Sequence, residues 1–154
     1  MKIQRDLSLP MNAEELIPQR PPLRFVNRLL QFDGVSGLVE AVLDADSLLC
    51  DDRGIVDPLA AVELMAQSYA TFKGYQDLLR GDPVKKGLLV SVRDCLITDT
   101  LLAGDRLEIM VKTFMVVSEF AIADASIRRG GRQIASATLK LFIPEDVRGD
   151  QPGR

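Results

Sequence analysis

The sequence contains no histidine, and this absence excludes more chemistry than any other feature of the composition. Without an imidazole, the chain alone can form neither a Ser-His-Asp triad, nor a Cys–His pair, nor a metal site with histidine ligands. The two cysteines, Cys50 and Cys95, are too far apart for a C-x-x-C motif and too few for a disulfide scaffold. We therefore expect free thiols in a reducing cytoplasm, with no metal and no cofactor.

Basic clusters and long apolar segments are also missing. The 19 lysines and arginines face 22 acidic residues, for a net charge of −3, and no basic run exceeds two residues, so the chain lacks the positive surface that binds DNA. The opening segment MKIQRDLSLPMN has no apolar core typical of a signal peptide. No apolar run approaches the roughly eighteen residues that cross a bilayer. We expect a cytoplasmic protein that binds neither nucleic acid nor membrane.

The composition is that of one folded domain. Hydrophobic residues make up 47% of the chain and charged residues 27%, which is unlike a disordered segment. A length of 154 residues accommodates one hydrophobic core, and no repeat or linker divides the sequence. We predict a single domain over residues 1–154, with an ordered core at about residues 13–144 and a frayed C-terminal tail.

The first part of the chain predicts a short helical segment and two strands. The helical segment covers residues 12–17 and is capped by Asn12. Three prolines then hold the backbone extended before strand-like patterns at residues 23–32 and 37–43. Because Asp33-Gly34 between them is typical of a turn, these two strands are predicted to form a hairpin.

One long helix is predicted at the centre of the chain. Asp57 suits the residue that caps a helix and Pro58 suits the first helical position. Over residues 59–79 apolar side chains cover most of the circumference in the first half, which is typical of a helix buried on nearly every side. Glu63 and Gln67 lie four residues apart and therefore share one narrow polar face.

The rest of the chain is rich in strand patterns, at residues 87–97, 106–117, 119–129 and 132–143. Two strands, a buried helix and four strands predict an α+β fold, in which one antiparallel sheet wraps around the long central helix. Such a sheet still has an outer face and edges to cover, so we expect a homodimer or a higher homo-oligomer.

Several segments resemble the β-hydroxyacyl-acyl-carrier-protein dehydratases, which have the hotdog fold. Residues 16–29, LIPQRPPLRFVNRL, resemble that family's LPHRxPFLLVDRV opening, and Glu63–Gln67, ELMAQ, resembles its E-x-x-A-Q helix motif. Gly104-Asp105 is similar to its GD before a long strand, and residues 131–142 to its final hairpin arm. The resemblance covers residues 16–143 and implies a stand-alone, dehydratase-like hotdog protein.

The resemblance also identifies missing catalytic groups. In that family a histidine removes the α-proton, a helix carboxylate protonates the departing hydroxyl across the dimer interface, and a backbone amide polarises the thioester carbonyl. The histidine position corresponds to Leu49 here, and the glycine position at the helix start corresponds to Pro58, which has no N–H to donate. Gln19 replaces a further histidine, whereas Glu63 and Gln67 remain. Standard dehydratase chemistry is therefore expected to be impaired.

Glu63 and Gln67 are accordingly the candidate catalytic residues. A carboxylate on an apolar helix needs a partner for its charge, and such groups serve in acid–base catalysis. The alternative is a structural ion pair, for example with Arg53. The resemblance implies that Arg53, Asp57 and Leu59 contribute to substrate binding, with Arg53 either contacting a phosphate of a pantetheine carrier or remaining solvated.

Three functions stay open. The first is binding or processing of 3-hydroxyacyl thioesters, on acyl carrier protein or coenzyme A, in fatty-acid or polyketide-type biosynthesis. The second is thioester hydrolysis with Glu63 as base or nucleophile. The third is a non-catalytic subunit that supports a histidine-containing hotdog partner. In the first, the aspartates at the helix entrance are alternative bases, namely Asp51, Asp52 and Asp57.

Overall fold

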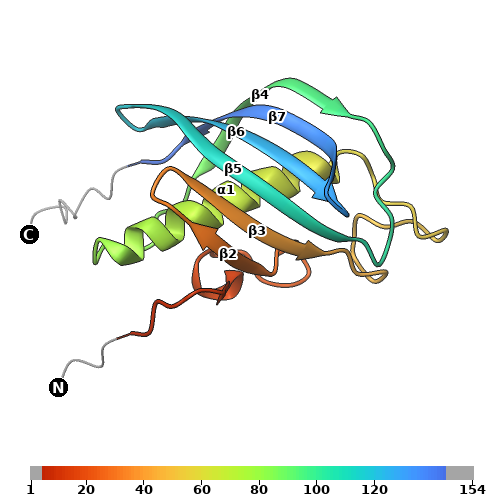
Figure 1. The fold of residues 1–154 in the computed structure, drawn as a ribbon, viewed down its shortest axis with the longest axis horizontal. Helices are drawn as coiled ribbons and strands as arrows, with labels where there is room; N and C mark the ends of the chain where they lie inside the picture. The colour runs from red at the N-terminus through yellow and green to blue at the C-terminus, as the bar shows by residue number, and fades with distance from the viewer. Residues whose placement is uncertain (1–4, 145–154) are drawn as a thin grey trace, which may run out of the picture.

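The structure consists of one seven-stranded antiparallel sheet and one long helix (Figure 1). It is a computed structural model that describes residues 5–144. The strands follow one another in the sheet in the order β1-β2-β3-β5-β6-β7-β4. The elements are β1 (Met11–Asn12), the short 3-10 helix η1 (Ala13–Glu15), β2 (Arg28–Phe32), β3 (Ser36–Val42), α1 (Ala60–Leu79), β4 (Leu88–Ile97), β5 (Arg106–Val117), β6 (Phe120–Arg129) and β7 (Arg132–Phe142). The expected frayed tail lies outside the described residues.

The helix α1 runs along the inner side of the curved sheet, as the sequence predicts (Figure 1). Its large apolar side chains are almost fully buried, including Leu64, Met65 and Phe72. They face the inward-pointing residues of the central strands, such as Val39 and Ile109, which alternate with polar or exposed ones. Burying each of the larger side chains stabilises the fold by roughly 1.5–3 kcal/mol. Within residues 5–144, α1 is too polar to count as a bilayer-crossing helix.

The helix begins at Ala60, slightly later than the sequence predicts. Asp57 still prepares its start, because its Oδ1 accepts a hydrogen bond of 2.9 Å from the N–H of Leu59. The carbonyl of Asp57 also accepts the N–H of Ala60 at 2.9 Å. Asp57 and Pro58 therefore form a turn that leads into the first helical residues, and they satisfy backbone groups that the helix itself leaves unpaired.

Two predictions for the first 32 residues are wrong. The predicted short helical turn is present as a single 3-10 turn, but in the described part of the chain Asn12 makes no side-chain cap bond. Strand β2 starts at Arg28, later than predicted. Upstream of it, the N–H of Phe25 and the carbonyl of Leu23 each form a 2.8 Å hydrogen bond with the Gln67 side chain. A helix side chain thus takes the place of a neighbouring strand as the backbone's partner.

Strand β4 forms one edge of the sheet. Among the described residues it pairs on one side, with β7. Apolar side chains are exposed along it, with Leu88 at 55% exposure and Val90 and Leu96 similarly open. A strand edge with unpaired backbone groups and exposed apolar side chains favours pairing with another subunit.

Candidate functional site

Glu63 and Gln67 are directly bonded on adjacent turns of α1. The Nε2 of Gln67 donates a hydrogen bond of 2.8 Å to Oε1 of Glu63. Gln67 is 2% exposed and Glu63 is half-buried. No lysine or arginine between residues 5 and 144 forms an ion pair with Glu63, so the structure does not contain the pairing with Arg53 that the sequence left open.

Gln67 fixes the position of the Glu63 carboxylate. Its second N–H donates to the carbonyl of Leu23, and its Oε1 accepts the N–H of Phe25. Both amide hydrogens and the amide oxygen are therefore engaged, which leaves the side chain one orientation. Gln67 thus connects the helix to the segment that follows the prolines, and it holds the carboxylate through that connection.

Both residues line a narrow pocket of about 140 Å³ between α1 and the start of β4. Gln19 also lines it, and its Oε1 is buried without a hydrogen-bond partner among the described residues. A buried acceptor left unpaired is costly, so a ligand that brings an O–H or N–H is favoured here. The apolar part of the lining is contributed by Ala66, Ala70, Leu88, Leu89 and Leu141. The pocket therefore suits a largely apolar ligand that carries a few polar hydrogens.

Leu49 lies in a different pocket from Glu63. This second pocket, of about 420 Å³, is at the start of α1 and is also lined by Cys50, Asp57 and Pro58. The resemblance to the dehydratases implies that Leu49 stands where their histidine lies.

Arg53 and Leu59 do not join Glu63 within the chain. The Arg53 side chain is 81% exposed, and its guanidinium lies 3.8 Å from the Asp51 carboxylate. Leu59 is 74% exposed. The Asp51 carboxylate accepts hydrogen bonds from the backbone N–H groups of Ile55 and Arg53, each at 2.9 Å. These bonds lower the pKa of Asp51, and the bond from Ile55 has the largest effect. A carboxylate with a lowered pKa is a weaker base, so this environment does not favour Asp51 as a substitute for the missing histidine.

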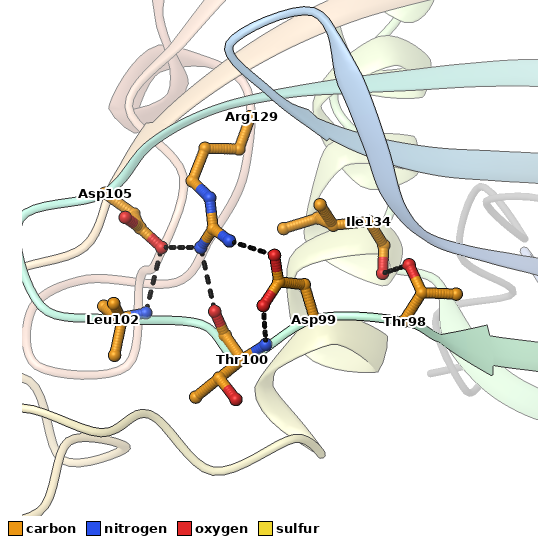
Figure 2. Close-up of polar contacts among 7 residues, drawn as sticks. All are labelled: Thr98, Asp99, Thr100, Leu102, Asp105, Arg129 and Ile134. Carbon is orange, nitrogen blue, oxygen red and sulfur yellow. Dashed lines mark hydrogen bonds and ion pairs between the residues drawn. The ribbon is translucent and has the colours of Figure 1, made fainter.

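The Asp105 of the GD motif anchors the loop between β4 and β5. Nη1 of Arg129 donates to Oδ2 of Asp105 at 2.6 Å and to the carbonyl of Thr100 at 2.8 Å, while Nη2 donates to Asp99 at 2.8 Å (Figure 2). The N–H of Leu102 donates to the same Asp105 oxygen at 2.9 Å. The guanidinium of Arg129 therefore binds three residues of this loop. The sequence alone does not predict this contact.

This anchored loop in turn supports the segment before α1. The N–H of Ala103 donates to the carbonyl of Gly54 at 2.8 Å, and the N–H of Val56 donates to the carbonyl of Leu101 at 2.9 Å. The GD motif thus acts through the backbone, and it positions the entrance of the helix that carries Glu63.

Replacing Arg129 by methionine is expected to lower the free energy of unfolding by about 1–2 kcal/mol, because several charge-assisted hydrogen bonds are lost at a partly exposed site. Urea denaturation measures this change. Arg128→Met is the matched control, since Arg128 is exposed on the same strand, and it should change the value by less than about 0.5 kcal/mol. Equal effects of the two substitutions would contradict the anchoring role.

Comparison with known protein families identifies the family of this chain. The ApeP-like family, described as ApeP dehydratase, matches residues 11–150 of the chain. The chain belongs to the ApeP-like dehydratase family. The resemblance to hotdog dehydratases inferred from the LIPQRPPLRF, ELMAQ and GD segments is thereby confirmed. Comparison of this ApeP-like chain with curated proteins gives no significant sequence match.

Solved structures share the fold of this ApeP-like chain at low sequence identity. A chain of the dehydratase heterocomplex ApeI:P from Xenorhabdus doucetiae superposes with a TM-score of 0.82 at 16% identity, covering 88% of this chain and 93% of that chain. A hypothetical thioesterase with coenzyme A from Streptococcus pneumoniae TIGR4 gives 0.60 at 13% identity, covering 75% and 84%. The PaaI protein of the E. coli phenylacetic acid degradation operon gives 0.59 at 13% identity, covering 74% and 80%. These likenesses confirm the predicted hotdog fold.

Proposed function

We propose that this chain is one subunit of a two-subunit hotdog dehydratase that acts on 3-hydroxyacyl thioesters carried by an acyl carrier protein. Loss of water from such a substrate needs a base for the α-proton and an acid for the departing hydroxyl. The observation that carries the proposal is the Glu63 carboxylate, held by Gln67 in a largely apolar pocket of a chain that has no histidine. In this proposal Glu63 is the acid, and the partner subunit supplies the base.

The two subunits then divide the proton transfers of the reaction between them. The partner's histidine takes the α-proton, the α–β double bond forms, and the C–O bond at the β-carbon breaks. Protonated Glu63 gives its proton to the departing hydroxyl, which leaves as water. Proton exchange with solvent afterwards restores both groups. Gln67 keeps the carboxylate oriented throughout, because its amide is fixed by the backbone of Leu23 and Phe25.

The proposed pair is asymmetric, because this chain has Leu49 and no histidine, whereas the proposed partner has one. One composite site combines the partner's histidine with Glu63 and is competent. The other combines the partner's carboxylate with Leu49, which cannot accept a proton. We therefore propose one working site for each pair of subunits.

Strand β4 is the proposed contact with the partner. Leu88 and Leu89 line the Glu63 pocket and are also exposed to solvent. A subunit paired along β4 would therefore cover the apolar edge and close one side of this pocket at the same time. The ApeI:P complex, which is described as a dehydratase heterocomplex, supports a pairing of two different hotdog subunits.

The test is co-expression with a histidine-containing hotdog homologue from the same organism. The expected result is a stable mixed complex that converts 3-hydroxyacyl-carrier substrate to the enoyl product, whereas the chain alone does not. Light scattering after gel filtration measures the assembly. Val90→Lys, which places a charge on the exposed β4 edge, should abolish association and with it turnover.

Val42→Lys is the control for this substitution, because Val42 is exposed on β3, away from the β4 edge, and it should leave the complex intact. Dehydration by the isolated chain as a homodimer would overturn the two-subunit proposal. Release of free thiol from acyl-coenzyme A that depends on Glu63, without dehydration, would instead identify the chain as a thioester hydrolase.

A further inference from the structure

A third pocket, different from the one that contains Leu49, adjoins the Glu63 pocket and is lined by cationic side chains. It has a volume of about 460 Å³, and Tyr69, Lys73 and Lys85 line both pockets, so the two pockets are adjacent. Arg80 adds a third cation to the larger pocket, and Glu119 contributes a carboxylate. We call this larger space the cationic pocket. Its charge contrasts with the net charge of −3 of the whole chain.

Lys73 and Lys85 are held next to each other by the buried Asp77. Nζ of Lys73 lies 2.9 Å from the Gln76 side-chain oxygen and 3.9 Å from Oδ1 of Asp77. The other carboxylate oxygen of Asp77 accepts the backbone N–H of Lys85 at 3.3 Å. Asp77 therefore brings the loop that carries Lys85 onto the end of α1.

The lining of the cationic pocket contains three cationic side chains and one carboxylate. Burial lowers the pKa of Lys73, Asp77 opposes this, and the positive charges of Arg80 and Lys85 add to the lowering. Within residues 5–144 the side chains of Arg80 and Lys85 have no ion-pair partner. An ammonium group has three donors, so Lys73 retains capacity beyond its bond to Gln76. An anion in this pocket would relieve the repulsion and satisfy these donors.

We infer that the cationic pocket binds an anionic group of the same substrate whose reacting carbon lies at Glu63. The inference rests on the proposed function. Glu63 and Lys73 are ten residues apart on α1, which corresponds to roughly 15 Å along the helix axis. The ligand must therefore be long, with its anion far from the reacting carbon. An acyl thioester offers two such anions, the phosphate of a phosphopantetheine arm and a carboxylate at the far end of the acyl chain.

Binding of acyl-pantetheine analogues in which a thioether replaces the thioester, so that they can neither lose water nor be hydrolysed, tests this inference with the full-length chain or its complex. Three ligands share one saturated acyl group: an acyl-pantetheine, its 4′-phosphate, and an acyl-pantetheine with a terminal carboxylate on the acyl chain. At least one of the two anionic ligands is expected to bind about tenfold more tightly than the neutral parent. Higher salt should reduce this gain. Isothermal titration calorimetry measures the affinities.

The substitutions Lys85→Met and Arg80→Met should remove the gain, which is measured in each variant against that variant's own affinity for the neutral ligand. Lys86→Met is the matched control, because Lys86 is the exposed neighbour and lines neither pocket, and it should retain the gain. Lys73 is left intact, since its removal would leave the buried Asp77 without its nearest cation.

The outcomes are distinct. A gain from the phosphate places the pantetheine arm in the cationic pocket, and a gain from the carboxylate places the end of the acyl chain there. No gain from either anion, or a gain that persists in Lys85→Met and Arg80→Met, overturns the inference. Because none of these ligands reacts, the result is independent of whether the protein catalyses dehydration.

Discussion

Replacing Glu63 by glutamine is expected to slow dehydration by the two-subunit complex by about 10²–10⁴-fold while the fold stays intact. Glutamine has nearly the same shape, and its side-chain oxygen can still accept the N–H of Gln67, a bond that is 2.8 Å long in the structure. It cannot donate a carboxylic proton to the departing hydroxyl. The loss should therefore appear in kcat, with KM and the thermal unfolding midpoint nearly unchanged.

Glu108→Gln is the matched control, because Glu108 is an exposed carboxylate on β5 and the same substitution there should leave the rate unaltered. The corresponding substitution of the helix carboxylate in the partner subunit is expected to have no effect, since its site contains Leu49. An unchanged rate in Glu63→Gln would show that Glu63 is not the acid. A loss of activity accompanied by a lowered unfolding midpoint would indicate a structural role instead.

The sequence predicts the central part of this site because its signals are local. Glu63 and Gln67 share a helix face as a direct result of the helical period, and the apolar residues around them predict that this face is buried. The strands after the helix are predicted closely for the same reason, since alternation of apolar and polar residues has a period of two. The antiparallel sheet around one helix follows from the order of these elements.

Contacts between distant segments could not be predicted in this way. The apolar and polar residues of 23–27 resemble a strand, yet their backbone bonds to Gln67, more than forty residues away in the sequence. The partners of Arg129 are likewise Asp99 and Asp105, which lie 30 and 24 residues upstream and which no local pattern indicates. The cationic pocket has the same origin, because Lys85 reaches Lys73 through a loop that is fixed by a buried carboxylate. Such groups become neighbours through tertiary folding alone.

Replacing Gly74 by alanine is expected to destabilise the protein by about 3 kcal/mol, although the same change in an exposed helix interior stabilises by about 1 kcal/mol. A Cβ added at Gly74 would overlap the carbonyl oxygen of Leu16 and would lie 2.9 Å from its carbonyl carbon. These are backbone atoms, so no side-chain rotation relieves the overlap. The segment of Leu16 and Ile17 must move instead, and both side chains are buried in the core. Overpacking therefore outweighs the gain in helix propensity.

Chemical denaturation measures the change in the free energy of unfolding. A Gly74→Ala protein as stable as the unsubstituted one would show that the Leu16 segment yields freely. The close approach also has a consequence for the site, because Gln19 follows shortly after Leu16 and lines the Glu63 pocket. Displacing this segment moves an unpaired acceptor relative to the carboxylate. The small residue at position 74 thus permits the contact between α1 and the N-terminal segment on which the shape of the pocket depends.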